Sequence, residues 1–179
     1  MSFKKTAISF EETGLFTKVF TDYIKGEPYL SQFYKYTPTL AGFKKAIEDR
    51  ANINADRSIL VKVLKERYKT SSEATAKNIS LLEDKNIFTV TTGHQLCLFT
   101  GPLYFIYKII TAINLADSLK KEYPQYNFVP VYWMAGEDHD FAEINHTYLF
   151  GKKVEWSGDS LAGCPVGRIS IETLAPVLD

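Results

Sequence analysis

NIFTVTTG (86–93), GHQLCLFTGP (93–102), LYFIYKIITAINLADSLKKEY (103–123) and FVPVYWMAG (128–136) follow one another almost without interruption. The first and last segments are short β-branched and aromatic runs, which are typical of strands. The third has the apolar periodicity of a helix, with cationic Lys120 and Lys121 in its last turn and Pro124 after it. The side of this helix expected to be buried carries Leu103, Ile106, Ile110, Ile113, Ala116 and Leu119. This order predicts an α/β fold in which one crossover helix joins two parallel strands.

Polar side chains follow both predicted strands. The first loop begins with Gly93, His94 and Gln95, and the second loop, EDHDFAEINH (137–146), comes directly after the second apolar run. Ligands of open parallel sheets bind at the carboxyl ends of the strands. We therefore expect the two loops to open onto one crevice and to form a binding or catalytic site.

The first loop has the features of an anion site. Gly93 and Gly101 bracket it, and Pro102 suits the first position of the following helix, whose free N–H groups attract an anion. Thr100 and Lys108 are further candidate donors. The glycine spacing matches neither GxxxxGK[ST] nor GxGxxG, so a dinucleotide is not indicated. The alternative is a polar turn that only caps the helix.

The second loop gathers acids, an amide and imidazoles within ten residues. These are Glu137, Asp138, His139, Asp140, Glu143, Asn145 and His146. Carboxylates flanking an imidazole suit acid–base catalysis, which makes His139, Asp138 and Asp140 the candidate catalytic residues. Two alternatives stay open. The acids cap a helix start, or His139, Glu143 and His146 lie on one helical face and ligate zinc in a metal-dependent hydrolase.

The zinc alternative is the weaker one, because HTYLF after the acids has an extended pattern and no HExxH motif is present. We therefore expect no metal. Trp133, just before the second loop, either lines the pocket or belongs to the core. Cys97 and Cys164 are expected to be packing thiols.

Composition limits the class of protein. Of 179 residues, 45% are hydrophobic and 23% charged, which is globular, and 21 basic residues balance 21 acidic ones. No basic field is available for nucleic acid. Two cysteines make no disulfide scaffold, the first residues lack a secretory signal, and no run is long enough to cross a membrane. We expect a cytoplasmic protein.

The regions on either side of the strand–helix–strand segment differ in character. Residues 1–85 are predicted to form a helical segment that packs on the core, with apolar stripes in 15–24, 40–47, 59–68 and 72–82. Residues 146–159 suggest a hairpin turning at Gly151-Lys152, and 162–170 a loop followed by a short strand. A helix pattern begins near the last residue, so we expect the chain to be truncated.

TGHQ, FTGPLY, WMAGEDHDF and EINH occur in the order and spacing of a known family. On these motifs the chain resembles the cysteine-adding enzymes of bacillithiol biosynthesis over 86–170, and more loosely before them. The resemblance implies a Rossmann-like core similar to class I nucleotidyltransferases. Residues 86–179 would be its first part, including the start of a connecting region. It also implies a homodimer formed through a C-terminal coiled coil that this chain lacks.

The resemblance implies a ligase that joins L-cysteine to glucosaminyl-malate as the last step to bacillithiol. No tightly bound cofactor is expected, and ATP or ADP is a possible co-substrate. The pocket would be bordered by 93–104, including Tyr104, and by 137–146. In this scheme His139 takes a proton from the ammonium group of cysteine. The alternatives are a nucleotide-binding module without catalysis and the metal-dependent hydrolase described above.

Overall fold

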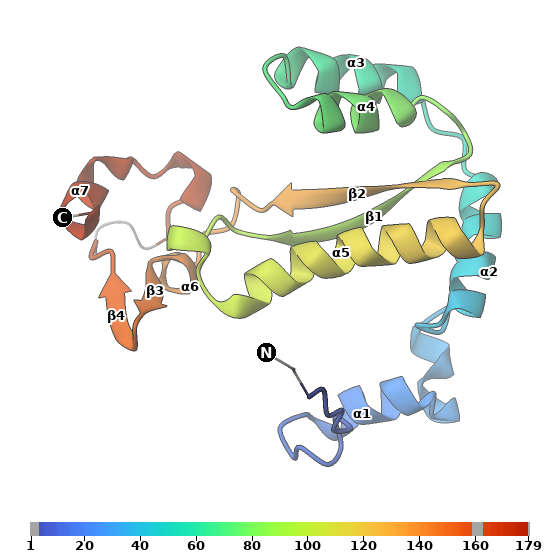
Figure 1. Cartoon of the computed structure of the whole chain (residues 1–179), viewed down its shortest axis with the longest axis horizontal. Helices are drawn as coiled ribbons and strands as arrows, with labels where there is room; N and C mark the ends of the chain where they lie inside the picture. Colours follow the sequence, from blue (N-terminus) through green and yellow to red (C-terminus); the bar gives the residue numbers. More distant parts are fainter. Residues whose placement is uncertain (1–3, 159–162, 179) are drawn as a thin grey trace. The chain divides into compact units, whose positions relative to one another are not determined.

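The computed structural model describes residues 4–158 and 163–178, and the chain divides into two compact units, Met1–Ala55 and Asp56–Asp179 (Figure 1). The division at 55/56 differs from the boundary expected at 85/86. The reason is that the helices between these two positions pack against the strands that follow them. Packing of residues 4–55 on this core stays a prediction.

The first unit contains α1 (Lys18–Lys25), a 3₁₀ turn (Pro28–Phe33) and α2 (Leu40–Ala51). Thr17 caps α1 by accepting a hydrogen bond from the Phe20 N–H, and Gly26 ends the helix at φ 76°, as its sequence predicts. Phe10, Phe16 and Phe20 form an aromatic cluster. The rest of the stripe is not a core face, since Leu15 is 84% exposed.

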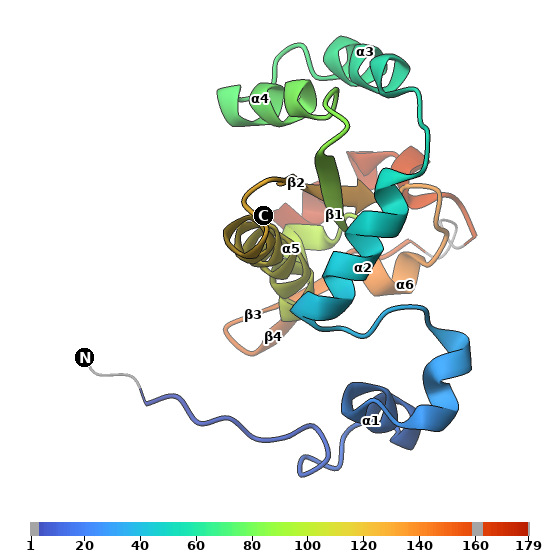
Figure 2. The same ribbon diagram turned by 90° about the vertical axis from the view of Figure 1, so that its right-hand side faces the viewer.

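The second unit is built on β1 (Ile87–His94) and β2 (Asn127–Met134), which are parallel and in continuous register along their whole length. The predicted crossover helix, α5 (Leu103–Glu122), joins them and packs on both strands. Helices α3 (Arg57–Arg67) and α4 (Glu73–Leu81) lie on the opposite side of the strands from α5 (Figures 1 and 2). Helices therefore lie on both faces of the strand pair, as in an α/β fold, and the strands are buried mainly in their first halves.

The core of this unit lies between the strands and α3 and α4. Its buried members are Val61, Ile79, Leu82, Ile87 and Val129. The Arg57 guanidinium donates to the carbonyl oxygens of Leu82 (3.1 Å) and Ile87 (2.9 Å), which ties the start of α3 to the start of β1. The apolar stripe of α3 that includes Ile59 was expected to face the core, and this expectation is wrong, because Val61 is buried while Ile59 is 60% exposed.

The buried face of α5 was also only partly predicted. Ala116 and Leu119 are buried as expected, together with Phe105 and Ala112. Four residues expected to be buried are exposed by 37–62% of their surface: Leu103, Ile106, Ile110 and Ile113. The helix is apolar on more than one side, and the two small alanines decide which side approaches the strands.

A second, smaller group of elements follows β2. Helix α6 (Phe141–Ile144) is a single turn, and β3 (His146–Leu149) and β4 (Lys152–Glu155) form the predicted antiparallel hairpin. The turn lies at Phe150-Gly151, where both φ angles are positive, instead of at Gly151-Lys152. The strand expected after 162–170 is wrong for the described residues, which form 3₁₀ turns at Val166–Arg168 and Ile171–Leu174 before α7 (Ala175–Leu178).

These elements close on the first loop. Leu98 from that loop is buried with Phe141, Ile144 and Trp156, and the indole of Trp156 donates to the Thr173 hydroxyl at 2.9 Å.

Within residues 4–158 and 163–178, no helix has the length and apolar character needed to cross a membrane.

Candidate functional site where the two loops meet

The first loop is folded back sharply on itself. Phe99, Thr100 and Gly101 all have positive φ angles (46°, 69° and 55°), and the Gly101 N–H donates to the Leu98 carbonyl at 2.8 Å. A Cβ atom at Gly101 would lie 2.4 Å from Cys97 Cβ, so only glycine fits there. Gly93 is similarly confined, because a Cβ there would meet the Trp133 carbonyl oxygen at 2.9 Å.

His94 lies at the end of β1 with a side chain only 8% exposed. Its Nδ1 is 3.1 Å from the carbonyl oxygen of Gln95, so we assign the hydrogen to Nδ1. Nε2 then accepts a hydrogen bond from the Tyr104 hydroxyl at 2.9 Å. The Tyr132 hydroxyl donates to the His94 carbonyl at 2.6 Å, which fixes the backbone beneath the ring. Tyr132 was not among the predicted site residues.

The two loops meet at Glu143, the first-turn residue of α6. The buried Gln95 amide donates to Glu143 Oε2 at 3.2 Å, and His94 Nε2 lies 3.8 Å from the same oxygen. We call the side chains of His94, Gln95, Cys97, Tyr104 and Glu143 the loop junction. The expectation that the loops come together is confirmed, although Glu143 makes the contact and not His139.

The acids beside His139 make local bonds. Asp138 Oδ1 accepts the N–H groups of His139 (2.6 Å) and Asp140 (3.1 Å). Asp140 caps α6 by accepting the N–H of Glu143 at 3.3 Å. Bonds of this kind are expected if the acids serve to cap the start of a helix, which was one of the two alternatives from the sequence. The His139 side chain is 76% exposed, with Nδ1 3.8 Å from Asp138 Oδ1.

The other predicted residues of the second loop lie outside the loop junction. Asn145 donates to the Trp156 carbonyl at 3.2 Å, and its carbonyl oxygen is 3.0 Å from His146 Nδ1, so this pair holds the start of the hairpin. Trp133 is 60% exposed and donates to Glu137 at 3.1 Å, so it is not a core residue, and its place beside a bound ligand stays a prediction.

The arrangement does not provide the zinc ligands of the hydrolase alternative. Helix α6 is one turn long, so His139 and His146 fall outside it. In the part of the chain that the structure describes, no three histidine, cysteine or acidic side chains are placed to hold a metal ion.

The start of α5 keeps the features expected of an anion site. Pro102 is the N-cap residue of α5, one position before the first helical position expected for it, and it makes no side-chain capping bond. Burial and the charge of Glu143 raise the pKa of Cys97, and the positive charge of Lys108 reaches the loop junction and offsets part of this rise. Thr100 is exposed at the end of the loop. An anion bound here stays a prediction.

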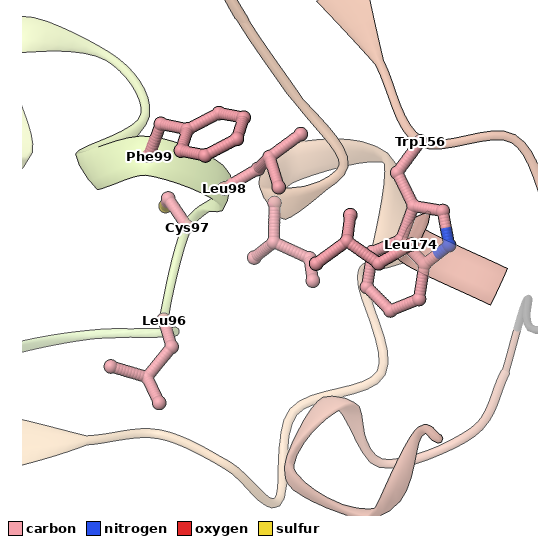
Figure 3. Close-up of a pocket in the computed structure, with 7 residues that line it drawn as sticks. Leu96, Cys97, Leu98, Phe99, Trp156 and Leu174 are labelled. Atoms are coloured by element: carbon pink, nitrogen blue, oxygen red, sulfur yellow. The ribbon is translucent and has the colours of Figure 1, made fainter. Parts of the chain in front are cut away.

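An apolar hollow of about 290 Å³ adjoins the loop junction. Figure 3 shows Leu96, Leu98 and Phe99 of the first loop on one side, facing Trp156 and Leu174 on the other. Cys97 also lines the hollow and is the residue that it shares with the loop junction. None of the predicted catalytic residues lines it, so the hollow is a neighbour of the polar site.

Cys97 is closer to an imidazole than its sequence suggests. Its Sγ lies 3.5 Å from His94 Nδ1 and 3.6 Å from the Gln95 carbonyl oxygen. Burial, and then the charge of Glu143, raise the pKa of the Cys97 thiol, so it is protonated at neutral pH. The only signal in the sequence was the three-residue spacing to His94 across a turn.

The raised pKa of Cys97 predicts slow alkylation. At pH 8 we expect iodoacetamide to label Cys97 several-fold more slowly than exposed Cys164, because the thiolate is the reactive form and burial disfavours it. Peptide mapping by mass spectrometry over time measures both rates. Equal rates, with the fold intact, would contradict the raised pKa.

Comparison with protein families shows which family the chain belongs to. The model of the N-terminal Rossmann-like domain of the bacillithiol biosynthesis protein BshC matches residues 3–179. The chain belongs to the BshC family. The match extends beyond the motifs to the helical first part of the chain. It confirms both the predicted Rossmann-like α/β class and the family resemblance.

Several BshC relatives are close to this chain. Proteins named "Putative cysteine ligase BshC" from Flavobacterium psychrophilum and Flavobacterium johnsoniae are each 51% identical to it, over 172 and 176 residues. A protein of the same name from Bacillus cereus is 41% identical over 138 residues, which are 75% of this chain and 25% of the relative. The two Flavobacterium alignments cover 93% and 96% of this chain but only 32% and 33% of the relatives. The chain therefore spans about a third of their length.

Proposed function

We propose that this chain contributes the strand-end site of a BshC ligase that joins L-cysteine to glucosaminyl-malate in bacillithiol biosynthesis. The observation that carries the proposal is the loop junction, where Gln95 after β1 bonds Glu143 after β2. This places polar groups from both strands at one edge of the sheet, where α/β enzymes bind their ligands. The names of the relatives support the proposal.

Amide formation from a free carboxylate is uphill and requires activation. In our proposal ATP supplies it, and the cysteine carboxyl becomes an acyl phosphate or an acyl adenylate. The uncapped first turn of α5, with Thr100, Gly101 and Lys108 beside it, binds the phosphate groups or the carboxylate. The close packing of Gly101 against Cys97 holds this turn in place beside the helix start.

The attacking group in this scheme is the amine of the sugar, since glucosaminyl-malate carries an amine and cysteine supplies the activated carboxyl. The group that loses a proton is therefore the sugar ammonium, and not the cysteine ammonium expected from sequence. His139 remains a candidate acceptor, with Asp138 next to its ring. Asp138 and Asp140 act in our proposal through the turn that they hold.

Two further features belong to the proposal. The full-length protein is a homodimer formed through a C-terminal coiled coil, and it works in the cytoplasm. Two unpaired cysteines, Cys97 and Cys164, are consistent with a reducing compartment.

The test is product formation by a protein of full family length that carries this chain. Incubation with L-cysteine, glucosaminyl-malate and ATP should yield a product whose mass is the sum of the two substrates minus water. Release of ADP indicates an acyl phosphate, and release of AMP an acyl adenylate. Omission of each substrate is the control. Nucleotide binding without any condensation product would contradict the ligase and favour the binding module.

A further inference from the structure

The loop junction contains one carboxylate among neutral donors. Glu143 Oε2 accepts the Gln95 amide, and the side chain of Gln95 is buried, so the carboxylate is held in place by a group that carries no charge. Glu143 itself is half exposed, with 50% of its side-chain surface accessible. Within residues 4–158 and 163–178, Oε1 of Glu143 accepts no hydrogen bond. One oxygen is therefore fixed and the other is open to a ligand.

The groups that face Glu143 do not neutralise it. Burial and the charge of Glu143 raise the pKa values of the Tyr104 hydroxyl and the Cys97 thiol, so both stay neutral at physiological pH. His94 presents Nε2 as an acceptor, because Nδ1 bonds the Gln95 carbonyl. The cation whose charge reaches this cluster is Lys108, and it makes no ion pair with Glu143 in the described part of the chain. Among the described residues, the Glu143 carboxylate is therefore hydrogen-bonded by the neutral Gln95 amide and by no lysine or arginine side chain.

We propose that Glu143 binds the ammonium group of the amine substrate at the loop junction. An ammonium needs hydrogen-bond acceptors and a compensating charge. Glu143 offers the charge and a free oxygen, and the Tyr104 hydroxyl oxygen, whose hydrogen goes to His94 Nε2, offers a further acceptor within the same cluster. The inference rests on the proposed function, because it takes the amino sugar as the substrate. In this proposal Glu143 of α6 binds the amine of the substrate, and the start of α5 binds the phosphate or carboxylate.

The test compares two ligands that differ in one group. Calorimetry measures the binding of glucosaminyl-malate and of glucosyl-malate, which has a hydroxyl in place of the amine, at a pH where the amine is protonated. Hydrogen bonds to charged groups are worth enough to give the parent protein a preference for the amine of about 10-fold to 100-fold. In Glu143→Gln this preference should disappear, because the affinity for glucosaminyl-malate falls to about that for glucosyl-malate.

Matched variants separate this role from a change in folding. Glu122→Gln makes the same replacement in the last turn of α5, at the other end of the helix from the loop junction, and should keep the full preference. Glu143→Asp keeps the charge on a shorter side chain and should keep part of it. Circular dichroism checks that each variant is folded. A preference for the amine that survives in Glu143→Gln, or no preference in the parent, would overturn the proposal.

The outcomes also separate this inference from the proposed function. If the parent binds the amino sugar through Glu143 but forms no condensation product, the ligase proposal fails alone. If ligation proceeds while Glu143→Gln binds the amine as well as the parent does, the assignment of Glu143 fails alone.

Discussion

Replacing Gly101 by alanine should lower the free energy of unfolding by about 3 kcal/mol and disorder the first loop. Two effects add at this position. A left-handed φ is unfavourable for a residue with a side chain, at about 1–3 kcal/mol. The new Cβ would also lie 2.4 Å from Cys97 Cβ, so the loop has to move. Urea unfolding followed by circular dichroism measures the loss.

Gly151→Ala is the matched control for strain without overlap. Gly151 has a φ of 79° and no heavy atom within 4 Å of an added Cβ, so only the conformational term of about 1–2 kcal/mol remains. Adding Cys97→Gly to Gly101→Ala removes the atom that clashes and should recover part of the loss. If Gly101→Ala is no worse than Gly151→Ala, the close approach to Cys97 is wrong.

Replacing Ile87 by alanine should destabilise the second unit by about 3 kcal/mol. Ile87 is 1% exposed and packs with Val61, Ile79, Leu82 and Val129 between β1 and the two helices that cover it. Truncating a fully buried isoleucine removes apolar contacts and leaves a cavity, which typically costs about 2–5 kcal/mol. The urea midpoint of the second unit should fall while the slope of the transition stays the same.

Ile59→Ala in α3 is the control for the same chemical change at the surface. Ile59 is 60% exposed, and alanine has the higher helix propensity, so a change within about 0.5 kcal/mol is expected. A loss at Ile59 as large as that at Ile87 would show that the apolar stripe of α3 is buried as its sequence suggested.

Local order could be predicted from the sequence wherever a short-range signal decided it. Thr17, Asp56 and Ser72 cap the first residues of their helices, and the alternation from strand to helix to strand gives β1, α5 and β2. These features depend on neighbours within one or two turns. The buried face of a helix depends instead on contacts with distant parts of the chain. Helix α5 has apolar residues around most of its circumference, and contact with the strands selects Phe105 and Ala112 over Leu103 and Ile110.

The candidate site was predicted at the level of loops but not of side chains. Parallel strands bind ligands at their carboxyl ends, and this rule predicted that residues 93–104 and 137–146 lie close together. Which side chains touch depends on where α6 begins, and Asp140 begins it one residue after His139. Glu143 therefore falls in the first turn of α6 beside Gln95, while His139 stays in the turn before it. A shift of one residue in a cap is beyond what spacing alone resolves.

The hydrogen bond from Gln95 to Glu143 connects segments that are 48 residues apart in the chain. Under our proposals these segments hold different ligands, a phosphate or carboxylate at the start of α5 and an amine at α6. Their binding is then thermodynamically linked. If bound nucleotide changes the affinity for the amino sugar by some factor, bound amino sugar changes the affinity for the nucleotide by the same factor. This holds whichever ligand binds first.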